Sequence, residues 1–169
     1  IGEYTALVLY DNAHAHSARE LIVDPQVEKL EPIARECGFS LDNIPVGYNN
    51  LLLRTRERTV LVDAGIQRPI GELWLGLQEL EIDPGDIDTI VVTHSDRDHI
   101  GGILNEDGGR SFPNARYVVL EESWQQWSSR QGRVELTRLN DWTEEKTQFA
   151  WETYSRIEAL ITTVAPGEE

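Results

Sequence analysis

The sequence contains very little sulfur, with one cysteine and no methionine. A single cysteine excludes an internal disulfide bond. Cys37 lies directly before Gly38 at the end of an expected helix, and we expect a small buried apolar side chain there rather than a reactive thiol. Because the chain begins at Ile1 and has no methionine, we expect that its natural start has been removed.

Positive charge and long apolar runs are also scarce. The 15 lysines and arginines are set against 30 aspartates and glutamates, which gives a formal net charge of −15. Such a surface repels phosphate backbones and anionic lipids, so nucleic-acid and membrane partners are disfavoured. No apolar run approaches the ~20 residues that cross a bilayer, and residues 1–10 lack the basic start of a signal peptide. The compartment stays open, with the cytoplasm favoured.

Against this background, residues 93–102 carry an unusual density of metal-binding side chains. His94, Asp96, Asp98 and His99 follow directly on the apolar run of residues 89–92. Imidazole nitrogen and carboxylate oxygen are the donors that zinc, manganese and iron accept. The alternative is a polar loop whose acids and histidines are merely solvated. The density of donors favours a metal site at the edge of a sheet.

The spacing of these residues predicts how they share the metal. In an extended chain, side chains two residues apart point the same way, so His94 and Asp96 can reach one ion. Asp98 and His99 follow a bend and can reach a second ion, or the water bound to the first. Gly101 and Gly102 let the backbone approach the site closely. We therefore expect one or two divalent ions.

The hydrophobic content of 40% in 169 residues is enough for one globular domain with its own core. Apolar patterns predict helices alternating with strands, which favours an α/β layered fold. The expected strands are residues 4–10, 48–54, 58–62, 87–93 and 117–120, with a hairpin at 55–57 and a loop at 11–17. The expected helices are residues 27–37, with an irregular start at Pro32, and 69–80, 122–129 and 141–161.

The run His94-x-Asp96-x-Asp98-His99-x-Gly101-Gly102 resembles the signature of the metallo-β-lactamase superfamily. The resemblance extends to Asp63-Ala64-Gly65 and to the flanking residues 82–88 and 112–119. Glu121, Trp124 and Trp127 resemble the lactonase-like branch. The resemblance implies the N-terminal half of an αββα sandwich and zinc as the metal. It also implies that Asp63 does not bind the metal but supports and orients the residues that do.

Two departures from the family pattern matter. The family's second histidine is Asp96 here, a harder ligand that makes manganese or iron an alternative to zinc. The family also needs a further histidine downstream, but none follows His99. We therefore expect residues 1–169 to be one metallo-β-lactamase-like domain that is incomplete at its C-terminus. A degenerate, non-catalytic metal-binding domain is the competing interpretation.

These features together predict a metal-dependent hydrolase that activates water to cleave an ester, a lactone or a similar acyl bond. Asp98 is the expected catalytic residue, because it can orient the attacking water and accept its proton. The expected partner is a neutral small-molecule substrate, and a homo-oligomer stays open. A phosphodiesterase or nuclease of the same superfamily is the alternative within hydrolases.

Overall fold

The computed structural model describes residues 4–22, 26–139 and 143–167. The chain divides into two compact units. The larger unit combines Ile1–Asp11 with Asn49–Glu169, and the smaller unit is Asn12–Tyr48. The residues of the expected metal site all belong to the larger unit.

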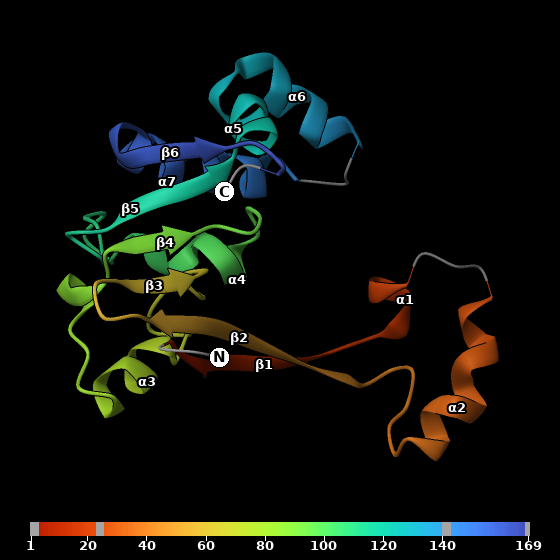
Figure 1. The fold of residues 1–169 in the computed structure, drawn as a ribbon. Helices are drawn as coiled ribbons and strands as arrows, with labels where there is room; N and C mark the ends of the chain where they lie inside the picture. The colour runs from red at the N-terminus through yellow and green to blue at the C-terminus, as the bar shows by residue number, and fades with distance from the viewer. Residues whose placement is uncertain (1–3, 23–25, 140–142, 168–169) are drawn as a thin grey trace. The chain divides into compact units, whose positions relative to one another are not determined.

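The described residues form a six-stranded sheet whose spatial order, β1 to β6, is the order of the strands along the chain (Figure 1). β2 and β3 form an antiparallel hairpin in which Leu52 pairs with Leu61. β3, β4, β5 and β6 run parallel to one another. The strands are β1 (Thr5–His16), β2 (Ile44–Arg54), β3 (Thr59–Val62), β4 (Thr89–Val91), β5 (Arg116–Leu120) and β6 (Ile161–Val164).

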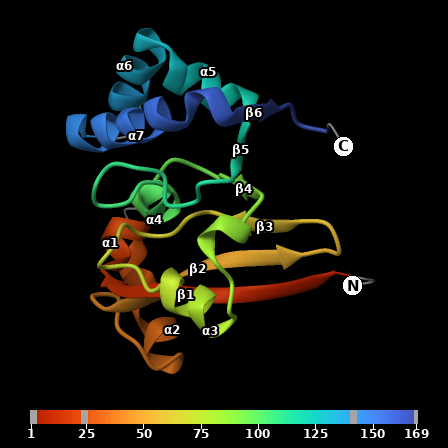
Figure 2. The same ribbon diagram turned by 90° about the vertical axis from the view of Figure 1, so that its left-hand side faces the viewer.

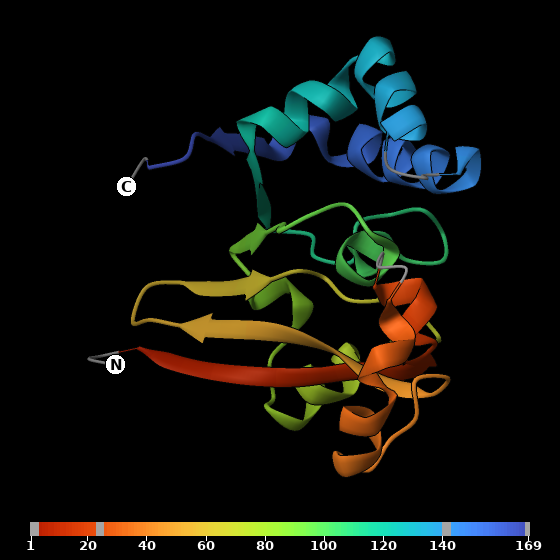
Figure 3. The same cartoon turned by 90° about the vertical axis from the view of Figure 1, so that its right-hand side faces the viewer.

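Parallel neighbours need a crossover connection, and helices provide it in the larger unit. α3 connects β3 to β4, α4 connects β4 to β5, and α5, α6 and α7 connect β5 to β6. The last three helices gather beside β5 and β6 (Figures 2 and 3). The helices are α1 (Ala18–Leu21), α2 (Glu31–Glu36), α3 (Leu73–Glu79), α4 (Arg97–Ile100), α5 (Glu121–Ser128), α6 (Arg130–Leu139) and α7 (Glu144–Ile157). Short 3-10 turns cover Val27–Leu30, Pro84–Asp86, Gly101–Ile103 and Glu158–Leu160.

The core of the larger unit lies between the sheet and these helices. Alternating strand residues are fully buried, among them Leu61 on β3, Ile90 on β4 and Tyr117 on β5. They belong to one apolar cluster with helix residues such as Leu77 and Ile157. Burying the apolar face of a sheet under helices is the α/β layered architecture that the sequence predicts. None of the helices in the described residues is long and apolar enough to cross a bilayer.

The smaller unit has its own apolar cluster of Ala18, Val27, Ala34 and Leu41. α1 begins at the N-cap Ser17, whose side chain and Glu20 form a capping box. As expected, residues 27–37 begin irregularly, because Pro32 lies in the first turn of α2 and a 3-10 turn precedes it.

The hairpin, the helix within residues 69–80 and the strands at β4 and β5 are confirmed. Three expectations are wrong. The expected loop at 11–17 instead continues β1 as far as His16, where the strand neighbours β2. Cys37 is exposed, not buried. The expected helix 141–161 ends earlier, at Ile157, and Ile161–Val164 forms β6. Residues 141–142 of that expected helix lie outside the described residues, and α6 was not expected.

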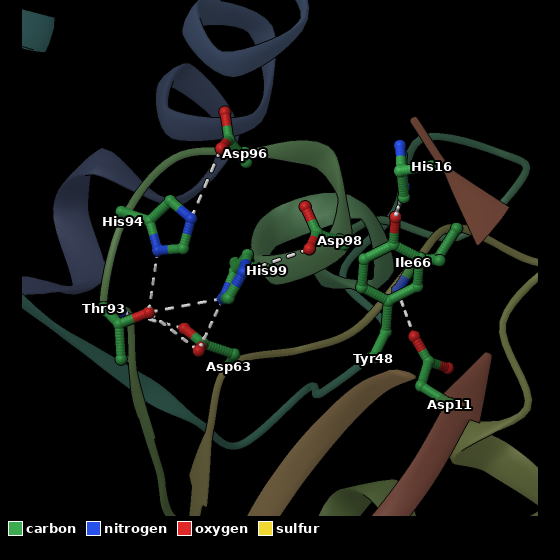
Figure 4. Close-up of polar contacts among 10 residues, drawn as sticks. All are labelled: Asp11, His16, Tyr48, Asp63, Ile66, Thr93, His94, Asp96, Asp98 and His99. Atoms are coloured by element: carbon green, nitrogen blue, oxygen red, sulfur yellow. Dashed lines mark hydrogen bonds and ion pairs between the residues drawn. The ribbon is translucent and has the colours of Figure 1, made fainter. Parts of the chain in front are cut away.

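Asp11 fastens the loop between β3 and α3 to β1. Its buried carboxylate accepts hydrogen bonds from the backbone N–H of Ile66 at 2.7 Å (Figure 4) and of Leu73 at 2.8 Å. A Cβ at Gly65 would lie 2.7 Å from one oxygen of this carboxylate, and a Cβ at Gly71 would lie 2.6 Å from the other. Both glycines are therefore needed for the loop to close around the carboxylate.

Replacing Asp11 by alanine leaves two backbone N–H groups without their acceptor. We expect the free energy of unfolding to fall by about 3 kcal/mol, measured by denaturant titration. The matched control is Asp107→Ala, because the Asp107 side chain is exposed, and it should change stability by less than about 0.5 kcal/mol. Equal stability of the two variants would contradict the role of Asp11.

Gly102 is another glycine at which a side chain does not fit. A Cβ there would lie 2.0 Å from the carbonyl oxygen of Ala64, because the turn Gly101–Ile103 packs directly on the backbone after β3. Gly102→Ala should therefore lower the free energy of unfolding by about 2–3 kcal/mol. The control Gly76→Ala, inside α3, would meet its nearest atom at an ordinary 3.5 Å and should stabilise by about 0.5–1 kcal/mol. If Gly102→Ala unfolds at the same denaturant midpoint as the unsubstituted protein, the close packing at Gly102 is refuted.

Candidate metal centre

The expected metal residues follow the carboxyl ends of two adjacent parallel strands. Val62 on β3 pairs with Val91 on β4, so the residues that follow, Asp63 and Thr93–His94, emerge side by side. Asp63 has a left-handed backbone with φ of 62°, a conformation that aspartate tolerates better than most residues. Ligands and reactive groups gather at this edge of α/β sheets because the loops there are free to carry them.

The Asp63 carboxylate ties the two strand ends together (Figure 4). One oxygen accepts the backbone N–H of Thr93 at 2.8 Å. The other lies 2.8 Å from the Thr93 hydroxyl and 2.7 Å from Nδ1 of His99. Asp63 therefore fixes the orientation of the His99 ring and leaves its Nε2 directed elsewhere.

Asp98 lies on the other side of the same ring. Its carboxylate is 3.1 Å from Nε2 of His99, so this imidazole is held between two carboxylates. Burial lowers the pKa of His99, but the hydrogen bonds to Asp63 and Asp98 and their charges outweigh it and raise the pKa to about 9. Burial raises the pKa of Asp98, but the hydrogen bond and charge of His99 hold it below its ordinary value. The surroundings of His99 thus stabilise positive charge.

His94 and Asp96 are more exposed than this pair. Nε2 of His94 lies 3.4 Å from Asp96, and these side chains are 51% and 46% exposed. The rings of His94 and His99 approach to 3.7 Å between centroids. The structure therefore brings together His94 with Asp96, and His99 with Asp98 and Asp63, while the two histidine rings lie in contact at an interplanar angle of 47°.

The donor types fit a divalent cation. Imidazole nitrogens and carboxylate oxygens gather after β3 and β4, and the Asp63 carboxylate holds Nδ1 of His99 as carboxylates hold metal-bound histidines. Over residues 4–22, 26–139 and 143–167, however, no three His, Cys, Asp or Glu side chains lie close enough together to hold a metal ion. The described donors contact one another instead, His94 with Asp96 and His99 with both Asp63 and Asp98.

Two residues of the motif make contacts that sequence reasoning missed. Besides Asp63, the Thr93 hydroxyl contacts Nδ1 of His94 at 3.1 Å. Ser95 is buried, and its hydroxyl lies 2.9 Å from that of Tyr154 on α7. Burial raises the pKa of Tyr154 to about 12, although the hydrogen bond to Ser95 opposes this. Neither contact has a signal in the sequence beyond the proximity of Thr93 and Ser95 to the histidines.

The pair His14 and His16 belongs to the smaller unit and has its own partners. Nε2 of His16 lies 2.8 Å from the Tyr48 hydroxyl, and Nδ1 lies 3.4 Å from Glu20. The His14 ring is 5.8 Å from the ring of Tyr48. These residues form a hydrogen-bonded cluster on the extended β1, not the loop that residues 11–17 were expected to form.

Comparison with known proteins by structure finds close likeness of fold. The dizinc quorum-quenching lactonase AidC, in complex with a product, N-hexnoyl-L-homoserine, superposes with a TM-score of 0.83 at 20% identity. The hydrolase AbOPH superposes with a TM-score of 0.80 at 21% identity. In both cases the likeness covers 100% of this chain and 60% of the other.

Comparison by sequence finds a nuclease. The exodeoxyribonuclease WalJ of Streptococcus pneumoniae serotype 2 (strain D39 / NCTC 7466) is 29% identical over 114 residues, and the match covers 59% of this chain and 41% of WalJ. The chain thus spans less than half the length of this relative.

The family comparison matches residues 44–157 to the Metallo-beta-lactamase superfamily. The matched region contains β2 to β5, the carboxylate of Asp63 and the whole run from His94 to Gly102. Because the match covers well over half of the 169 residues and the fold agrees with it, this chain belongs to the metallo-beta-lactamase superfamily.

Proposed function

We propose that the protein is a metal-dependent hydrolase that cleaves an ester, a lactone or a similar acyl bond. The observation that supports this most directly is the imidazole of His99 between two carboxylates, beside the ring of a second histidine. This cluster follows the carboxyl ends of the parallel strands β3 and β4, the edge of an α/β sheet where ligands bind. A purely structural loop has no need for so many titratable groups.

His94, Asp96, Asp98 and His99 would hold one or two divalent ions. Zinc is the first choice, because the lactonase AidC, which has a similar fold, is described as dizinc. Asp96 is a harder ligand than histidine and makes manganese or iron the alternatives. Such a cation would supply a lowered pKa for bound water and would stabilise negative charge on the substrate.

The other roles in the reaction would be carried out by side chains of the motif and of Asp63. Asp98, on the Nε2 side of His99, would orient the attacking water and accept its proton. Asp63 would keep the His99 ring in one orientation and one tautomer through Nδ1. Gly101 and Gly102 would support the site because, without side chains, the turn Gly101–Ile103 can pack against residues 64–67.

The substrate class is proposed from fold and charge together. Two hydrolases share the fold, one of them a lactonase, and a net charge of −15 favours a neutral small molecule over nucleic acid or a membrane surface. The second candidate is a phosphodiester substrate, which the 29% identity to WalJ favours. A homo-oligomer and a cytoplasmic location also remain proposals.

Replacing Asp98 by alanine should lower kcat for hydrolysis by about 10³-fold, because a positioned base is lost. The assay measures hydrolysis of a lactone, a thioester, a β-lactam and a phosphodiester, each with added Zn²⁺ or Mn²⁺. Chelation should abolish the activity of the unsubstituted protein, and either ion should restore it. Asp107→Ala is the control and should keep full activity. Full turnover by Asp98→Ala would refute the role of Asp98, and hydrolysis of the phosphodiester alone would replace the proposed substrate class with the second candidate.

Replacing Asp63 by asparagine keeps the shape of the side chain but removes its charge. We expect the affinity for Zn²⁺ or Mn²⁺ to fall by about 10- to 100-fold, because His99 loses its carboxylate acceptor. A competition titration with a metal-binding dye measures this. Asp88→Asn is a suitable control, because Asp88 accepts the backbone N–H of Thr59 at the opposite ends of β3 and β4 from the metal motif. Unchanged affinity in Asp63→Asn would exclude the supporting role of Asp63.

A further inference from the structure

Ser95 is a buried residue in the middle of an exposed loop. Ser95 is only 6% exposed, whereas the side chains of its neighbours His94 and Asp96 are 51% and 46% exposed. Because side chains alternate in an extended chain, a Ser95 side chain that points into the protein directs those of His94 and Asp96 outward. The direction of two proposed metal ligands therefore depends on what holds Ser95.

The partner of Ser95 is Tyr154 on α7, and the two hydroxyls lie 2.9 Å apart. Tyr154 is fully buried on the face of α7 that also carries Ala150 and Ile157. Trp124 and Trp127 of α5 lie against its ring, each with centroids 5.9 Å away. A phenol enclosed in this way has little freedom, so it offers Ser95 a fixed partner.

A second contact joins the same helix to the same loop. Arg97 lies 2.9 Å from Glu145 and 4.4 Å above the ring of Phe149, both on α7. The Arg97 and Glu145 side chains are 50% and 81% exposed, so water and salt screen their ion pair and it contributes little. The hydroxyl pair is buried, and leaving either hydroxyl without its partner is costly. Of the two contacts, Ser95–Tyr154 is the one that controls the loop.

We propose that Tyr154 is a positioning residue of the metal site, which acts through Ser95 to hold His94 and Asp96 in the orientation that binds the cation. This inference rests on the proposed function, because it assigns a role toward the same metal ligands. Tyr154 does not contact the substrate or the ion in this role. It holds residues 94–96 from the far side of the loop, through the hydroxyl of Ser95.

The test uses Tyr154→Phe, Ser95→Ala and the double variant. Each single variant should lower the affinity for Zn²⁺ or Mn²⁺ by about tenfold, because one hydroxyl of the pair is left without its partner. The double variant should lose no more than either single one, since the interaction is lost only once. Hydrogen–deuterium exchange of residues 93–100 in the metal-free protein should speed up by about tenfold in Tyr154→Phe.

Tyr117→Phe is the matched control. Tyr117 is also fully buried, but its hydroxyl has no hydrogen-bond partner within the described residues. It should keep the affinity and the exchange rates of the unsubstituted protein. All titrations are run well below the thermal midpoint of every variant, so that global unfolding does not contribute.

The outcomes separate the two proposals. If Tyr154→Phe keeps both the metal affinity and the slow exchange of residues 93–100, the positioning role is wrong. If the unsubstituted protein binds neither ion, the proposed function fails, and the exchange rates alone decide whether Tyr154 holds the loop. If Tyr117→Phe loses affinity to the same extent as Tyr154→Phe, the effect comes from general destabilisation and the positioning role is again wrong.

Discussion

The geometry of the site depends on one buried carboxylate. Asp63 follows β3 in a left-handed conformation, which costs on the order of 1 kcal/mol for a residue with a Cβ. In return its side chain, 8% exposed, contacts the Thr93 amide, the Thr93 hydroxyl and the His99 ring. Hydrogen bonds to a charged group contribute about 1.5–3 kcal/mol each, so these contacts outweigh the backbone cost. The loop after β4 therefore has one preferred arrangement relative to β3.

This constraint divides the site into two parts. His99 is surrounded by Asp63 and Asp98 and is largely fixed, whereas His94 and Asp96 are about half exposed. The fixed part is attached to β3 through Asp63. The exposed part is attached through Ser95 to α7, an element that comes nearly sixty positions later in the chain. His94 also contacts the Thr93 hydroxyl that Asp63 holds, so the exposed part depends on both α7 and the end of β3.

The sequence predicted the elements whose signal is local. The hairpin of β2 and β3 follows from its apolar strands and charged turn, and β4 follows from the run of apolar and β-branched residues 89–93 before His94. The close approach of Gly102 to Ala64 also agrees with what two glycines after the motif predict.

What the sequence did not predict depends on partners that are distant in the chain. Asp11 is the acceptor for a loop 55 residues away, and nothing near it shows that its carboxylate is buried. Ser95 looks like a solvated residue between two ligands until α7 provides Tyr154. The residues at β6 continue an apolar helical pattern, and pairing with β5 decides their extended conformation. That Asp63 orients the ligands was expected only from the family resemblance, and its contact with His99 was not predicted, because no spacing rule relates two residues 36 positions apart.

The strand order has a consequence for how the molecule forms. Since β1 to β6 are neighbours in space in the same sequence as along the chain, each strand can add to a sheet edge that its predecessor has just created. Each closure then joins strands that are consecutive in the chain, which keeps its entropic barrier lower than pairing strands further apart in the chain would. The strand ends that carry Asp63 and His94 are adjacent members of this series. The framework of the site can therefore form during chain growth, before the helices that follow β5 have been synthesised.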